Sequence, residues 1–186
     1  MHPFLRPFCF LALGVAIACN DSTSLGDPTE TNVVDTVTPG ALEGTPIAVA
    51  SGFNISVGAI RTDQSVDFEF AYNVRRLADG SYQRVFVPRA ALGLSSTTAN
   101  PGLQLRSESF DDITRAPSNG YTADSAVAIQ VGERYTVRSR VVCTSLGVPL
   151  YGKLEILSFQ DSTVTFKVLT DLNCGFRELV PGLPKN

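Results

Sequence analysis

Residues 66–74 read Val66-Asp67-Phe68-Glu69-Phe70-Ala71-Tyr72-Asn73-Val74. Apolar side chains occupy every second position of this stretch, and most positions between them are polar or charged. Such a period of two is typical of a β-strand with one buried and one hydrated face, whereas a helix would scatter the apolar groups around its circumference. We therefore expect a strand whose Asp67, Glu69 and Asn73 side chains face water.

The same alternation recurs along the chain. It predicts further strands over residues 47–51, 54–60, 81–87, 126–131, 134–144, 150–159 and 163–170. Turn-forming residues separate these segments, and only residues 89–94 suggest a turn of helix. About seven or eight short strands without intervening helices predict an all-β protein, an antiparallel immunoglobulin-like β-sandwich. Residues 95–122 are expected to form a long irregular loop on it.

The first twenty residues, MHPFLRPFCFLALGVAIACN, have the layout of a secretory signal peptide. Arg6 precedes an uncharged apolar run over residues 7–18, and small residues end that run. The run is about twelve residues long, whereas a membrane-spanning helix needs about twenty. The chain is therefore expected to be exported without a permanent transmembrane helix.

The four residues Ala16-Ile17-Ala18-Cys19 resemble the lipobox of bacterial lipoproteins. The resemblance implies that residues 1–18 are removed and that Cys19, then the first residue, is acylated and holds the protein to a membrane. Because Asn20 follows it rather than Asp, analogy favours the outer membrane. The family prefers Leu at the position of Ala16, and Ala16-x-Ala18 also fits ordinary signal cleavage, which would give a freely secreted protein.

The mature chain divides into a tether and a domain. Residues 19–44 are rich in Ser, Thr, Asp, Gly and Pro and predict a flexible tether, while residues 45–186 form the β-sandwich. Val33, Val34 and Val37 offer an alternative, a first edge strand within the tether. The tail over residues 171–184 carries enough apolar groups to fold back over one end of the sandwich.

Composition excludes much enzyme chemistry. The only histidine is His2, so the chain after residue 18 has none, and Ser-His-Asp triads, imidazole bases and histidine metal sites are closed to it. We expect a protein without catalytic residues or cofactor; a hydrolase that uses only carboxylates is the remaining enzymatic alternative. After residue 18 the chain carries 14 basic and 18 acidic residues without a basic cluster, which argues against nucleic acid as a partner.

Two cysteines remain in the domain, Cys143 and Cys174. Export to an oxidising compartment favours a disulfide between them, which would add about 3 kcal/mol of stability in the chain-entropy model. Two buried free thiols are the alternative. Two cysteines without histidine fall short of the four ligands of a structural zinc site.

A weak ligand surface is predicted around Arg138, Arg140 and Tyr121. Arg138 and Arg140 should share one strand face, where two guanidinium groups can bind an anion, although cross-strand pairing with Glu155 is the simpler expectation. Tyr121 is the aromatic residue expected to be exposed, in the long loop. The acidic residues near that loop match no calcium-binding spacing, so we expect no metal; they are Glu108, Asp111, Asp112 and Asp124.

Two functions fit these expectations. The first is a non-enzymatic, lipid-anchored cell-envelope protein that acts as a structural, adhesive or complex-assembly module with other envelope proteins. The second is a lipoprotein that binds a small ligand or glycan through residues 95–122. A concave pocket between that loop and Arg138 would favour the second.

Overall fold

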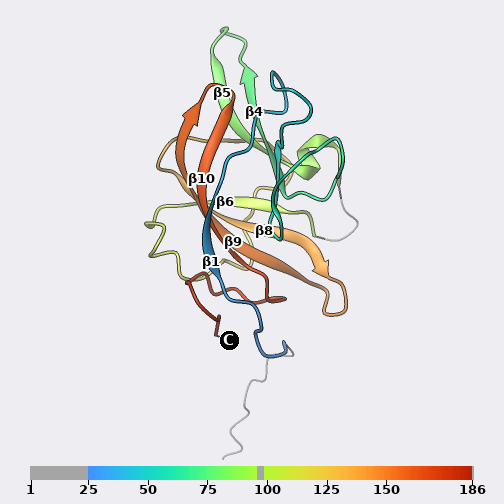
Figure 1. Cartoon of the computed structure of the whole chain (residues 1–186), viewed down its shortest axis with the longest axis vertical. Helices are drawn as coiled ribbons and strands as arrows, with labels where there is room; N and C mark the ends of the chain where they lie inside the picture. The colour runs from blue at the N-terminus through green and yellow to red at the C-terminus, as the bar shows by residue number, and fades with distance from the viewer. Residues whose placement is uncertain (1–24, 96–98, 186) are drawn as a thin grey trace, which may run out of the picture.

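The computed structural model describes residues 25–95 and 99–185 and shows an all-β fold built from two antiparallel sheets (Figure 1). One sheet has the order β1-β10-β9-β8-β6 and the other β3-β2-β4-β5-β7. The elements are β1 (Val33–Val37), β2 (Gly52–Asn54), β3 (Gly58–Ile60), β4 (Phe70–Arg76), β5 (Tyr82–Pro88), the 3₁₀ helix η1 (Arg89–Leu92), β6 (Gly102–Arg106), β7 (Val127–Ala128), β8 (Arg134–Cys143), β9 (Val148–Gln160) and β10 (Thr163–Asp171). The all-β class and the antiparallel pairing are confirmed, and the described residues form ten strands instead of seven or eight.

Aromatic side chains fill the core between the sheets. Phe70 of β4 lies 4.3 Å from Phe86 and 5.2 Å from Phe53, measured between ring centroids, and Phe166 of the opposite sheet lies 5.7 Å from Phe86. All four are almost completely buried, and each such burial stabilises the fold by about 2–3 kcal/mol. The alternation that predicted β4 therefore places Phe70 and its neighbours where expected.

The expectation of a hydrated opposite face on this stretch is wrong for Glu69 and Asn73. Both are buried, because other segments cover that face. Glu69 Oε2 accepts a hydrogen bond of 2.7 Å from the Ile55 amide, and Asn73 Oδ1 accepts one of 3.1 Å from the Glu43 amide. Only Asp67, before the strand begins, is exposed as predicted.

Two predicted strands are corrected in the segment before β4. Residues 47–51 form turns, with Ile47 74 % exposed. Residues 54–60 form a hairpin rather than one strand, because the Asn54 side chain accepts hydrogen bonds from the Ser56 and Val57 amides and Gly58 adopts φ +83°. An Asx turn followed by a left-handed glycine reverses the chain.

The tether expectation for residues 19–44 is also wrong in its second half. Val33–Val37 form β1, an edge strand paired with β10 from Val33↔Thr170 to Val37↔Phe166, as the alternative reading of those valines proposed. The chain is already fastened before β1, since the Thr29 and Glu30 amides donate to Asn173 Oδ1 at 2.8 and 2.9 Å.

The long loop and the C-terminal tail together form an outer layer, which we define as residues 107–122 and 173–184. The two segments pair with each other: the Ala116 amide donates to Arg177 O and the Leu179 amide to Thr114 O, both at 2.8 Å. A second apolar cluster lies between this layer and the sheet that contains β9 and β10; it comprises Phe110, Ile113, Ala116, Tyr151, Leu169 and Leu179. The tail thus covers a sheet face, and the irregular excursion contains strand β6, which the sequence did not predict.

Cys143 at the end of β8 forms a disulfide with Cys174 in the tail, with 5.8 Å between the Cα atoms. The predicted pairing is confirmed. A disulfide indicates an oxidising environment of the kind exported proteins meet. Within residues 25–95 and 99–185, no helix has the length and apolarity needed to cross a membrane.

Candidate functional site

Arg138 and Tyr121, two residues of the predicted ligand surface, contact each other. The Arg138 guanidinium carbon lies 4.8 Å from the centre of the Tyr121 ring, and Nη2 donates to Asn100 O at 3.2 Å. The Tyr121 hydroxyl donates to Pro117 O at 2.9 Å, and burial raises its pKa to about 12. Tyr121 is therefore a half-buried part of the outer layer, and the prediction of an exposed aromatic residue is corrected.

Arg140 does not share the face of Arg138. The β8–β9 register gains one residue on β8 between Arg138 and Val141, and a bulge of one residue moves every following side chain to the other face. Arg140 Nη2 instead reaches Asp67 at 2.8 Å. The two arginines thus bind separate partners and form no joint anion site.

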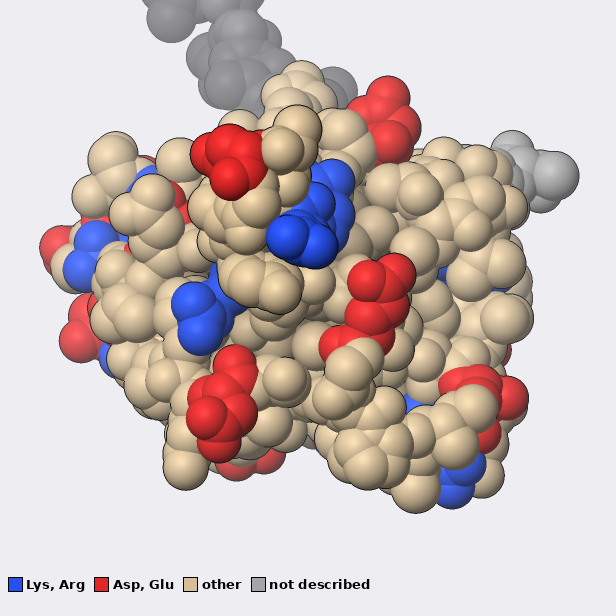
Figure 2. Space-filling model, turned by 90° about the horizontal axis from the view of Figure 1, so that it is seen from above, with Lys and Arg blue, Asp and Glu red and all other residues tan. Residues whose placement is uncertain are grey.

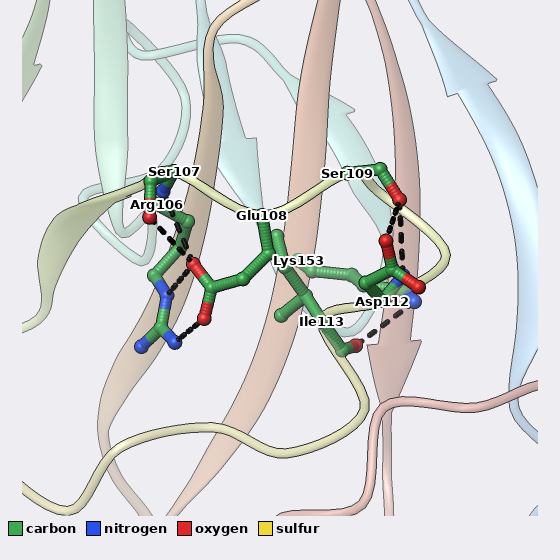
Figure 3. Close-up of polar contacts among 7 residues, drawn as sticks. All are labelled: Arg106, Ser107, Glu108, Ser109, Asp112, Ile113 and Lys153. Atoms are coloured by element: carbon green, nitrogen blue, oxygen red, sulfur yellow. Dashed lines mark hydrogen bonds and ion pairs between the residues drawn. The ribbon is translucent and has the colours of Figure 1, made fainter.

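Lys153 of β9 is the most deeply buried cation that the structure describes, with 1 % of its surface exposed. Its ammonium group donates to Phe110 O at 2.7 Å and to Ile113 O at 3.0 Å, and Figure 3 shows the second of these bonds. It also lies 4.5 Å from the centre of the Phe110 ring. Burial lowers the Lys153 pKa. With two carbonyl acceptors and an aromatic face, this lysine holds the outer layer onto β9 and has no access to a substrate.

The acidic residues of the same loop are engaged locally. Glu108 forms an ion pair with Arg106, whose hydrogen bond lowers the Glu108 pKa to about 2, and Asp112 accepts a 2.6 Å hydrogen bond from the Ser109 hydroxyl (Figure 3). Among the residues described, no group of three or more His, Cys, Asp or Glu side chains is arranged to hold a metal ion.

Charged residues of three neighbouring strands, β8, β9 and β10, form ion pairs on the outer face of their sheet. Glu155 of β9 accepts from Arg134 Nε of β8 at 3.1 Å and from Lys167 Nζ of β10 at 3.0 Å. Burial raises the Glu155 pKa, but the bonds from Lys167 and Arg134 outweigh it and the net pKa is lowered. The expected cross-strand partner Glu155 is therefore used, by Arg134 rather than by Arg138 or Arg140.

Two cavities open between the sheets. One, of about 230 Å³, lies between edge strand β1 and the β2–β3 hairpin, and its walls combine polar residues with apolar ones, among them Val37, Phe53, Ile55 and Val168. The other, of about 320 Å³, lies at the end of the molecule formed by the β4–β5 hairpin, and we call it the hairpin cavity. Its lining includes Tyr82, Arg84, Gln130 and Phe159.

The hairpin cavity has a cation without an anion. The Arg84 guanidinium carbon lies 4.6 Å from the centre of the Phe159 ring. Its Nε is buried and donates no hydrogen bond, and Arg84 takes part in none of the ion pairs between described residues. The buried Tyr72 hydroxyl lies beside Arg84 but makes no hydrogen bond of good geometry; burial raises the Tyr72 pKa, and the charge of Arg84 and its contact with the hydroxyl oppose this rise.

Strand register explains why these groups converge. In the β4–β5 pair, Tyr72 lies opposite Phe86, Val74 opposite Arg84 and Arg76 opposite Tyr82, and opposed residues point to the same face. The core face of the hairpin thus continues outward beyond Phe86 as Arg84 and then Tyr82. Tyr82 is 70 % exposed, so it is the exposed tyrosine that was expected at Tyr121. Figure 2 looks onto this end and shows basic groups near the middle of the face with acidic groups around them.

The sequence held a signal for this site. Counting by twos from the core residue Phe86 reaches Arg84 and Tyr82, and counting from Tyr72 reaches Arg76. An arginine in the buried register of a strand needs either a partner or a function. The alternation along β5 thus predicts that Arg84 lies on the core face. It does not predict that Arg84 lies over Phe159, because Phe159 is about seventy-five residues away in the sequence.

Comparison with protein-family models, with curated proteins and with solved structures finds no match to the chain.

Proposed function

We propose that this chain is a non-enzymatic, lipid-anchored cell-envelope protein, an immunoglobulin-like display domain that serves as a structural or complex-assembly module with other envelope proteins. The Ala16-Ile17-Ala18-Cys19 motif, which lies outside the described residues, supplies the anchor, and the outer membrane is the favoured location. The absence of histidine after residue 18 supports a role without catalysis.

The proposal rests on how the chain ends and the β4–β5 hairpin are placed at opposite ends of the domain. The described chain begins and ends at one end of the sandwich, and the β4–β5 hairpin lies at the other (Figure 1). Thr29 is the first residue fastened to the domain by its backbone, through Asn173. An anchor at Cys19 would then be joined to it by ten residues, which span at most about 35 Å. The hairpin would point away from the membrane.

Mass spectrometry of the mature amino terminus tests the anchor. Peptides that begin at acylated Cys19 are expected, and the Cys19→Ser variant is expected to leave the membrane fraction. Asn20→Asp is the matched control, because it changes the sorting residue and leaves the acylated cysteine in place. An unmodified Cys19, or a different first residue, contradicts the anchor.

Extraction in mild detergent tests the assembly role. The protein is expected to migrate on native gels in a complex larger than one copy of the chain, whose mass is 19.9 kDa before residues 1–18 are removed, and the complex is expected to be lost in Cys19→Ser. Migration as a monomer would contradict assembly while leaving the anchor intact.

Ligand binding is the second candidate. At its expected location beside Arg138, the described residues make internal contacts, since Arg138 and Tyr121 bind each other. Arg84 in the hairpin cavity takes part in none of the ion pairs among the described residues, which favours a ligand site at the opposite end of the sandwich.

A further inference from the structure

The hairpin cavity holds its cation over an aromatic ring with a buried Nε, as the outer layer holds Arg138, but, among the described residues, without a carbonyl like that of Asn100, to which Arg138 donates. Arg84 lies over Phe159, which holds the guanidinium group against an aromatic face. Its Nε is buried without a hydrogen bond and the group lies beside the Tyr72 hydroxyl, so a ligand in the cavity would use the terminal nitrogens. A planar pair of N–H donors matches the two oxygens of a carboxylate.

The remaining lining adds groups suited to a polyhydroxylated ligand. Tyr82 contributes an exposed aromatic ring at the rim, and an aromatic ring can pack against the C–H face of a sugar while its hydroxyl stays hydrated. Gln130 supplies an amide with both donors and acceptors. Arg76, opposite Tyr82 in the register, carries a second positive charge on the same face.

We propose that the hairpin cavity binds an acidic saccharide, with its carboxylate on the terminal nitrogens of Arg84 and a sugar ring against Tyr82. The aliphatic residues that line the cavity are Ala128, Ile129 and Val131. The cavity is more polar than apolar, and its inner aromatic ring, Phe159, is covered by Arg84, so a polyhydroxylated ligand suits it better than the apolar side chains of a peptide. A volume of about 320 Å³ suits one or two sugar rings. The inference does not rest on the lipid anchor and stands or falls separately from it.

Titration calorimetry with trigalacturonic acid tests the proposal, on the exported chain with Cys19→Ser in every arm. The acid is expected to bind at least about tenfold more tightly than its trimethyl ester, which keeps the rings and removes the charges. Equal affinity for acid and ester would overturn the proposal without any substitution. Triglutamate is the peptide comparison, and binding as tight as that of the saccharide would overturn the saccharide assignment.

Substitutions in the hairpin test whether the acid binds in the hairpin cavity. Arg84→Met is expected to weaken binding of the acid about tenfold or more, and Tyr82→Ala about fivefold. Arg75→Met is the matched control, because Arg75 lies one residue from Arg76 and donates to Gln83 at 2.9 Å on the other face of the hairpin. It is expected to change the affinity by less than about twofold. A loss in Arg75→Met equal to that in Arg84→Met would mean general attraction to a basic end, and unchanged binding in Arg84→Met would likewise refute the site.

Discussion

Most charged residues around the outer layer have a partner, whereas Arg84 at the hairpin end takes part in none of the ion pairs among the described residues. Around the outer layer, Lys153 is capped by two carbonyls, Glu108 is paired with Arg106, and Glu155 is shared by two cations. At the hairpin end, Arg84 lies in a cavity with an aromatic ring but no carboxylate. Buried nitrogens without a hydrogen bond occur in both regions, at Arg138 Nε and at Arg84 Nε, and such groups cost free energy. Arg138 also donates to Asn100 O, so the hairpin is the region where a partner from outside would stabilise a cation more.

The difference also separates stability from function. Residues that fasten the outer layer should affect unfolding when changed, whereas hairpin arginines should affect binding and leave the fold intact. Measurements of stability at both regions therefore test whether the contrast is real.

The largest effect is expected from the disulfide that ties the tail to β8. Replacing both cysteines, as Cys143→Ala with Cys174→Ala, opens a loop with a sequence separation of 31 and should lower the free energy of unfolding by about 3–4 kcal/mol. For a chain of this size the melting temperature should fall by about 6–15 °C, measured by calorimetry. A reducing agent should reproduce the shift in the unsubstituted protein and add nothing in the double variant; an unchanged melting curve would show that the tail is held by packing alone.

Glu69, at the base of the hairpin, gives the next effect. Burial raises its pKa to about 7, although the Ile55 amide and Arg140 oppose the rise. The folded state therefore holds a proton that the unfolded chain releases near pH 4.5. Stability should fall as pH rises from about 4.5 to 7, by about 2–3 kcal/mol from this group. Urea unfolding across that range measures it, and Glu69→Gln should flatten the curve; an equal slope in the variant would assign the dependence to other groups.

Substitution of Lys153 tests how much its hydrogen bonds to the outer layer stabilise the fold. Lys153→Met keeps the length of the side chain but leaves the Phe110 and Ile113 carbonyls without their donor, and should cost about 2 kcal/mol. The control is Lys167→Met, since Lys167 also lies over the Phe110 ring, at 4.0 Å, but is partly exposed and paired at the surface; it should cost less than about 1 kcal/mol. Amide exchange should quicken over the loop near Phe110 in the first variant only. Equal costs would mean that burial of the lysine adds nothing.

Local pattern was enough to predict the strands whose partners are adjacent in sequence. β5, β8, β9 and β10 lie within a few residues of their predicted bounds, because their alternation agrees with pairing across short turns. The disulfide followed from composition and compartment. The reversal at Asn54 and Gly58 agrees with turn chemistry, although the apolar run around it favours a single strand.

The sequence pattern does not predict which distant segments cover each strand face. Glu69 was expected to be wet because its own strand alternates, and a segment around Ile55 buries it. Arg140 was placed on the wrong face because one bulge residue reverses the alternation. Lys153 holds the outer layer onto β9 only because a loop some forty residues earlier in the chain folds over it. Each error comes from a contact that period-two counting along a single strand does not contain.

The smallest change in stability is expected at the hairpin. Arg76→Ala removes an exposed cation that takes part in none of the ion pairs among the described residues, so the free energy of unfolding should change by no more than about 0.5 kcal/mol. Because Arg76 shares its face with Tyr82, the same variant should still weaken binding of trigalacturonic acid. Unfolding in urea beside the unsubstituted protein measures the first quantity, with Lys153→Met as the destabilised reference. A loss of stability comparable to that of Lys153→Met would make Arg76 a structural residue and remove the contrast between the two regions. Unchanged stability together with weakened binding is the result expected if the hairpin end binds a ligand.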